Sequence, residues 1–200
     1  MSESGTATST ATGVAREPLG VRDTRLLRSH PMNKSLLDDA FAHHVWASLR
    51  LLDACLELSP EQLGTTVPGT YGSILDTQRH LVGSDGWYLY RVTGDDTHRM
   101  DEDHMDLPAL RAAMEGHGAL WSQILAQDPD PDAILIGRND DGTETHAATG
   151  IRLAQVLHHG TDHRSQICTA LTALGMEPPG IDLWDFGAET GRVVEIPATS

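Results

Sequence analysis

Residues 149–174 read TGIRLAQVLHHGTDHRSQICTALTAL and carry a regular helical pattern. Apolar or small residues recur every three or four positions, which is the period of one face of an α-helix. The members of this stripe are Val156, Gly160, Ile167, Leu171 and Leu174. Gly175 follows the stripe and suits a helix C-terminus, because glycine adopts the left-handed conformation at little cost. The segment is therefore predicted to be one long helix with a face turned toward a core.

Three further segments share this period, and with residues 149–174 they predict an all-α protein built as a four-helix bundle. They are residues 33–58, 73–92 and 107–127. Stretches rich in glycine, proline or aspartate separate the helices. The connection before the last helix is a long crossover, and residues 132–147 within it predict a small hairpin or an extended segment.

The ends of the chain differ from its centre. Residues 1–31 are rich in Ser, Thr, Gly and Ala without a sustained period, which predicts a flexible N-terminal extension. Residues 32–175 are predicted to form the bundle. Residues 176–200 are predicted to be an irregular C-terminal tail, whose Trp184 and Phe186 could pack back onto the bundle.

Charge and missing motifs exclude several function classes. With 29 acidic and 14 basic residues, the formal net charge is -15, and an acidic surface repels nucleic acids and anionic membranes. No apolar run approaches the roughly 20 residues that span a bilayer, and the N-terminus lacks the order of a signal peptide. The motifs GxSxG, GxxxxGK[ST], GxGxxG and HExxH are absent. We therefore expect a cytoplasmic protein whose partner is neither a nucleic acid nor a membrane.

The chain has 11 histidines, and two of them, His159 and His163, lie four residues apart on the predicted last helix. Side chains at this spacing point the same way, with Cβ atoms about 5–6 Å apart, so the pair could hold one metal ion. At about 100° per residue, His158 points to nearly the opposite side. The alternative is a polar helix flank with hydrogen-bonded histidines. Gly160 costs a helix interior about 1 kcal/mol relative to alanine, which suggests that another helix or a ligand approaches closely there.

A third metal ligand would have to come from another helix, because catalytic zinc sites usually have three protein ligands and one open position. His80 is the leading candidate, since it lies in the middle of the second predicted helix. It lies off the main apolar stripe of that helix, beside Ser73, Ser84 and Trp87, a face that could line a wet pocket instead of dry core. The spacing alone leaves open whether His80 is a metal ligand. Asp76, one turn earlier, could orient the His80 imidazole or be an exposed acid.

His44 lies on the inward face of the first predicted helix, whereas His43 points outward. His44 could be a fourth metal ligand, a general base or a contact to substrate. A hydrogen-bonded histidine in the core fits the same pattern, and the spacing does not separate these alternatives.

The histidine-containing stretches resemble the DinB/YfiT-like family of metal-dependent four-helix-bundle proteins. The resemblance extends over residues 32–175, and three stretches carry it: HHVWAS at 43–48, GSILDTQRHLV at 72–82 and LHHGTDHRSQI at 157–167. Many relatives have two histidines before the arginine of the last motif, where this chain has Asp162 and then a single histidine. The difference affects position 162, which points outward on the predicted helix.

In that family, one histidine of the second helix and the HxxxH pair of the last helix bind a divalent metal. The resemblance therefore implies His80, His159 and His163 as the ligands. Zinc is the default metal for three histidines, and nickel, iron and manganese are alternatives. Relatives commonly dimerise, so a homodimer is expected.

Several family members resemble transferases or isomerases that use a low-molecular-weight thiol: mycothiol, bacillithiol or glutathione. With 13 arginines and one lysine, the composition points to an actinobacterial source and so to mycothiol. The resemblance thus implies a metal-dependent enzyme that transfers a thiol to a small electrophile or uses it in isomerisation. A thiol-independent metal hydrolase or lyase, and a non-catalytic metal-binding module, are the alternatives.

Overall fold

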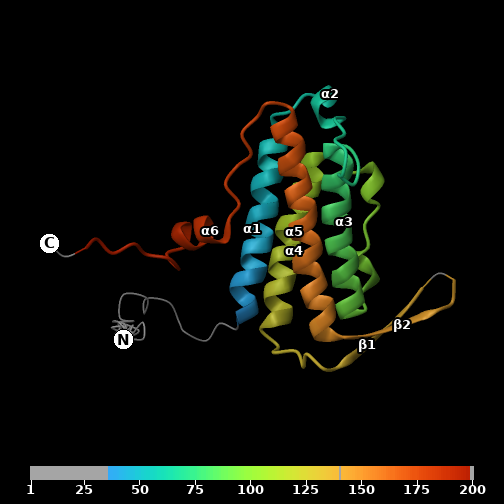
Figure 1. Cartoon of the computed structure of the whole chain (residues 1–200). Coiled ribbons are helices and arrows are strands. Elements are labelled where there is room, and N and C mark those ends of the chain that lie inside the picture. The colour runs from blue at the N-terminus through green and yellow to red at the C-terminus, as the bar shows by residue number, and fades with distance from the viewer. Residues whose placement is uncertain (1–35, 140, 199–200) are drawn as a thin grey trace, which may run out of the picture. The chain divides into compact units, whose positions relative to one another are not determined.

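The computed structural model describes residues 36–139 and 141–198, and its main feature is a bundle of four long helices (Figure 1). These helices are α1 (Leu36–Leu56), α3 (Ile74–Thr93), α4 (Leu107–Leu125) and α5 (Thr149–Ala173). They pack pairwise, α1 on α4, α4 on α3, α3 on α5 and α5 on α1. The all-α prediction is confirmed. The extension predicted for residues 1–31 lies outside the described residues. Among the described residues, no helix is both long and apolar enough to cross a membrane.

Local signals in the sequence fix where α3 begins and ends. The Ser73 hydroxyl accepts the Asp76 N–H at 3.1 Å, and the Asp76 carboxylate accepts the Ser73 N–H at 3.3 Å. This reciprocal capping satisfies two N–H groups that a helix start leaves without partners. Gly94 ends the helix in the left-handed conformation, at φ 77°. Asp76 is therefore the capping acid of α3, and its side chain is exposed, in agreement with the second of the two roles expected for it.

The long crossover before α5 contains a two-stranded hairpin, as one of the two alternatives predicted. Strands β1 (Ile134–Arg138) and β2 (Glu144–Ala148) pair antiparallel, with Ile136 opposite His146. In Figure 1 the hairpin lies at the end of the bundle where α3 finishes and α5 begins. Both strands contact the bundle, β1 on α3 and β2 on α5.

Short helices occupy two regions that were predicted to be irregular. Helix α2 (Pro60–Leu63) forms one turn in the predicted loop, because Ser59 caps its start. Helix α6 (Leu183–Glu189) lies within the predicted tail, where the Asp182 side chain accepts the Trp184 N–H. Phe186 of α6 packs edge-on against His43 and Trp46 of α1, whereas Trp184 is 71% exposed. A cap and one buried aromatic ring thus give order that a period cannot reveal in so short a segment.

The connection between α3 and α4 also contains regular structure. Two single-turn 3-10 helices, η2 (Asp96–His98) and η3 (Glu102–His104), both contact α3. Met100 packs against the core between them. The segment therefore brings one of its acids, Glu102, to the surface of α3.

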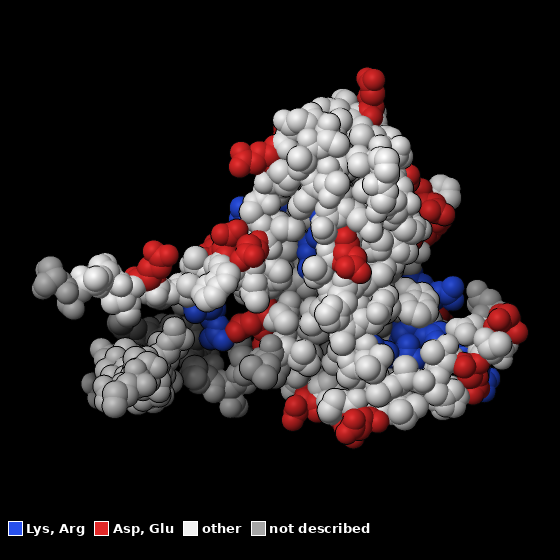
Figure 2. All heavy atoms as spheres, viewed as in Figure 1, with Lys and Arg blue, Asp and Glu red and all other residues white. Residues whose placement is uncertain are grey.

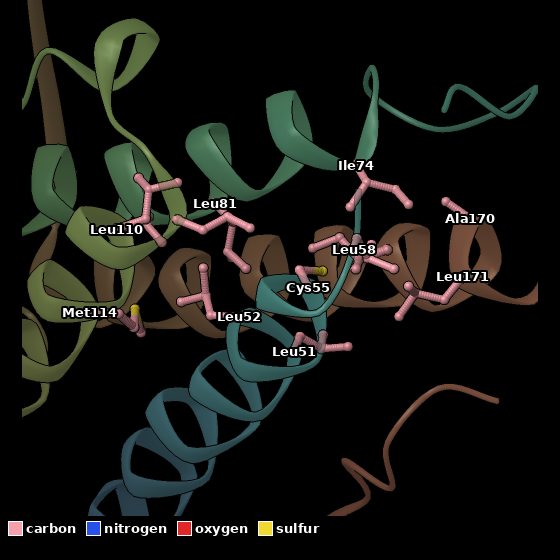
Figure 3. Close-up of a cluster of buried hydrophobic side chains, with 13 residues drawn as sticks. Leu51, Leu52, Cys55, Leu58, Ile74, Leu81, Leu110, Met114, Ala170 and Leu171 are labelled. Atoms are coloured by element: carbon pink, nitrogen blue, oxygen red, sulfur yellow. The ribbon is translucent and has the colours of Figure 1, made fainter. Parts of the chain in front are cut away.

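Two apolar clusters fill the interior of the bundle. Figure 3 shows the first, in which side chains of all four long helices meet around Leu51, Leu52, Leu81 and Leu171. The second contains six buried residues: Phe41, Leu89, Trp121, Leu125, Leu153 and Val156. Each cluster draws on every long helix, so burial of apolar area holds all four together.

A layer of buried polar side chains separates the two clusters, and each long helix contributes one residue: His44, Asp85, His117 and Arg164. His44 Nε2–H donates to Asp85 Oδ1 at 3.0 Å, and His117 Nδ1 lies 2.9 Å from Asp85 Oδ2. Arg164 Nη1 donates to His44 Nδ1 at 2.9 Å. Burial raises the pKa of Asp85, but the neighbouring His117 ring and the hydrogen bond from His44 hold it below its ordinary value. The carboxylate therefore stays ionised inside the bundle.

Gly160 of α5 allows this layer to form. A Cβ at this position would lie 2.4 Å from His44 Cε1 and 2.9 Å from Arg164 Nη1, which is closer than atoms can pack. The close approach expected from a glycine in the middle of a helix is therefore made by the His44 ring.

We predict that Gly160→Ala destabilises the fold while Gly116→Ala stabilises it. At Gly160 the added methyl has to displace a buried ring, and overpacking of this kind costs about 1–3 kcal/mol. Gly116 is exposed in α4, where a Cβ would meet nothing within 4 Å, so alanine there should gain about 0.5–1 kcal/mol of helix stability. Urea denaturation of both variants and the unmodified protein gives the comparison. Equal stabilisation by the two changes would contradict the close contact at Gly160.

Candidate metal centre

The structure brings His80 of α3 and His159 and His163 of α5 together on one side of the bundle. His159 Nε2 lies 3.3 Å from His80 Nε2 and 3.1 Å from His163 Nε2. One ligand atom from each of the three residues falls within 4.8 Å of the others. His158 is exposed on the opposite side of α5, as its angular position predicted.

These separations fit a small divalent cation. With zinc–nitrogen bonds of about 2.0–2.1 Å in a tetrahedral arrangement, neighbouring ligand atoms lie about 3.3–3.4 Å apart. The two separations that involve His159 Nε2 are within a few tenths of an ångström of that geometry, and all three ligand atoms lie within 4.8 Å of one another. The donor set of three imidazoles also suits zinc and the later first-row metals.

The outer ring nitrogens of two of the histidines have polar partners, and the amide oxygen beside His163 sets the tautomer of that ring. His163 Nδ1–H donates to Gln166 Oε1 at 3.0 Å, and the same oxygen accepts the Tyr71 N–H at 3.0 Å. His80 Nδ1 lies 3.4 Å from Ser84 Oγ and 3.6 Å from Glu102 Oε1. With its proton on Nδ1, each of these rings directs a lone pair on Nε2 toward the centre. Such outer partners are characteristic of metal-binding histidines.

Burial keeps the three imidazoles neutral, which is the form that binds metal. It lowers the pKa of His159 to about 4, and the neighbouring His163 and His80 rings lower it further. Burial also lowers the pKa of His80 and His163. Two or more lone pairs that converge at about 3 Å repel one another, and a cation between them would remove this repulsion.

Aromatic side chains flank the histidine cluster. The Tyr71 ring stacks on His80, with centroids 4.0 Å apart and planes 5° from parallel, and it meets His163 edge-on at 5.5 Å. The Tyr88 ring lies edge-on to His159 at 5.6 Å. Tyr71 is 56% exposed, so this side of the cluster lies at the surface and is accessible to a small molecule.

His44 lies apart from the three converging nitrogens. It is 1% exposed, and both of its ring nitrogens bond within the polar layer, to Asp85 and Arg164. Among the described residues, the group with metal-ligand spacing contains the three other histidines and no fourth residue. The structure therefore favours the buried core histidine over the fourth ligand, the general base and the substrate contact.

The sequence placed Ser84 beside His80, but sequence reasoning missed four other side chains that surround the cluster: Tyr71, Tyr88, Glu102 and Gln166. A helical signal existed for Gln166, because it lies three residues after His163. For Glu102 the signal in the sequence is of another kind, a glycine in the facing helix. A Cβ on Gly83 would lie 1.5 Å from Glu102 Oε2, so the glycine in α3 makes room for this carboxylate.

The fold and the cluster define a class: a four-helix bundle with three histidines from two neighbouring helices gathered on one side. The model of the DinB family matches residues 32–193, and the chain belongs to that family. The resemblance inferred from the three histidine-containing stretches is thereby confirmed. No curated protein matches the chain.

Proposed function

We propose that this chain is a metal-dependent enzyme that joins a low-molecular-weight thiol, mycothiol by preference, to a small electrophilic substrate, or uses the thiol in an isomerisation. The observation that carries the proposal is the convergence of three Nε2 atoms, with His159 Nε2 at 3.3 and 3.1 Å from its neighbours. Membership of the DinB family supports the thiol, because several family members resemble transferases or isomerases that use such a thiol.

A divalent cation held by His80, His159 and His163 would lower the pKa of a coordinating thiol and so favour the thiolate, which is the reactive nucleophile. Three neutral imidazoles leave the positive charge of the ion uncompensated, which strengthens this effect. No fourth ligand is present among the described histidines, cysteines and acids near the cluster. That arrangement suits a site with one position left for a ligand from solution.

The surrounding residues hold the histidines in place. Gln166 fixes both the His163 ring and the backbone of Tyr71 through one oxygen, and Tyr71 lies flat on His80. The sulfur would attack an electrophilic carbon from the exposed side, forming the S–C bond as the leaving group departs with its electron pair. His44 is not the base that removes the thiol proton, since its ring nitrogens already bond to Asp85 and Arg164.

We predict that the purified protein holds about one divalent metal ion per chain and that His159→Ala loses it. Removing a ligand should lower the metal affinity by more than the roughly 10–100-fold that loss of a ligand's outer hydrogen-bond partner costs. His158→Ala is the matched control, since His158 neighbours His159 in sequence but is exposed on the other side of α5. Elemental analysis and competition with a chromogenic chelator measure the effect. Equal metal content in the two variants would refute the three-histidine centre.

Thiol chemistry at this centre should be measurable directly. Metal-loaded protein should speed the conjugation of a bromobimane-type electrophile with mycothiol, and less so with bacillithiol or glutathione. Chelator and the His159→Ala variant should each remove the enhancement. Turnover that persists without any thiol would point instead to metal-activated water, since such a centre can lower the pKa of bound water to about 7. Failure to consume any of the three thiols would end the thiol proposal.

A further inference from the structure

Arg91 of α3 and Arg152 of α5 differ from the other arginines in the part of the chain that the structure describes. Six of those nine arginines lie within 4.0 Å of a carboxylate oxygen: Arg50, Arg79, Arg99, Arg111, Arg138 and Arg192. A seventh, Arg164, lies in the polar layer and in the field of Asp85. Arg91 and Arg152 have no carboxylate partner among the described residues.

Both of these side chains are more than nine-tenths buried, with exposed fractions of 8% for Arg91 and 7% for Arg152. Arg91 Nη1 donates to the Arg138 carbonyl at 3.1 Å, and Arg152 Nη2 donates to the Leu135 and Thr145 carbonyls at 3.1 and 3.3 Å. The Nε atom of each has no hydrogen-bond partner among the described residues. Burying a charged group without an opposite charge is costly, and two neighbouring cations add mutual repulsion. An anion bound beside the pair would offset both costs.

The surroundings hold the Arg91 guanidinium in one position. A Cβ on Gly137 of β1 would lie 1.7 Å from Arg91 Nη2, so the group lies against bare backbone. On α3 the Trp87 ring stacks with it, 4.8 Å from the guanidinium carbon to the ring centroid. A planar guanidinium held in this way presents its remaining N–H groups in a fixed arrangement. This arrangement suits the oxygens of a planar carboxylate or a tetrahedral phosphate.

The two arginines lie on the same helix faces as the metal centre. Arg91 is eleven residues after His80 and Arg152 is seven before His159. At about 100° per residue, each falls within about 20° of its histidine. With a rise of 1.5 Å per residue, Arg91 lies about 16 Å along α3 from His80, and Arg152 lies about 10 Å along α5 from His159.

The side chains between the histidines and the arginines are polar or aromatic. Gln155 Nε2 donates to the Tyr88 hydroxyl at 3.2 Å, which bridges α5 and α3 midway. Trp87 on this stretch is 40% exposed. Figure 2 shows basic side chains gathered where the hairpin meets the bundle, on a molecule whose visible surface is otherwise mostly acidic or uncharged.

We propose that Arg91 and Arg152 form a binding site for an oxyanion, a carboxylate or phosphate group, at the base of the hairpin. The further step, that this group is the anionic end of the molecule processed at the histidine cluster, rests on the proposed function. The site also answers a difficulty of that function, because a chain with a net charge of -15 repels anionic substrates unless a local cluster of cations receives them.

The test is isothermal titration of the full-length protein with inorganic phosphate and, separately, with acetate, at constant ionic strength. We expect one saturable site per chain. The probe that binds more tightly, phosphate or acetate, shows which kind of anionic group the site prefers. Arg91→Gln and Arg152→Gln should each weaken binding about tenfold or more, since a charge-assisted hydrogen bond contributes about 1.5–3 kcal/mol. Arg138→Gln is the control, because its exposed side chain pairs with Glu144 and should leave the affinity unchanged.

Two more variants separate this site from the metal centre and from misfolding. Gly137→Ala alters no charge, yet its methyl would occupy the space of the Arg91 guanidinium and displace it from its held position. It should therefore weaken anion binding while circular dichroism stays unchanged. His159→Ala should bind the anion as the unmodified protein does, even where the thiol assay fails. No saturable binding, equal binding by Arg152→Gln, or binding lost in His159→Ala but kept in Arg152→Gln would each overturn the arginine site.

Discussion

The ionised carboxylate of Asp85 is the constraint on which the rest of the bundle depends. A buried charge is tolerable only when hydrogen-bond donors surround it, and His44 and Trp121 supply donors from α1 and α4. Arg164 of α5 completes the layer through His44. Apolar clusters alone allow helices to rotate and slide at modest cost. The polar layer removes that freedom, because each donor has to meet one particular acceptor.

The polar layer also determines where the histidine cluster lies, because members of the two groups are close in sequence on the same helices. Arg164 directly follows His163, so turning Arg164 inward sets the rotation of α5 and presents His159 and His163 toward α3. Asp85 is five residues after His80, or about 140° around the helix, so its inward placement leaves His80 at the side of α3. Cluster and layer are thus two outcomes of one packing arrangement, and Gly160 allows both by admitting the His44 ring.

Periodicity could reveal the parts of the molecule that depend on position within a helix. The four helices, the pairing of His159 with His163 and the exclusion of His158 follow from the angle per residue alone. Features made by contacts between distant residues were out of reach: Glu102 meets α3 because Gly83 is small, and the Tyr71 ring reaches His80 from a loop held by Gln166. The inward position of His44 was visible in the sequence, but its partners Asp85 and Arg164 lie 41 and 120 residues away.

The long connection before α5 has a physical role beyond joining two helices. Its backbone carbonyls at Leu135, Arg138 and Thr145 accept hydrogen bonds from two buried arginines. Joining two helices does not require the burial of two guanidinium groups, which costs free energy. The other described arginines mostly have carboxylate partners. Backbone dipoles compensate part of the charge and leave the rest for an anion. The proposed oxyanion site is therefore the simplest account of why the hairpin, and not a shorter loop, lies at this end of the face that carries the histidines.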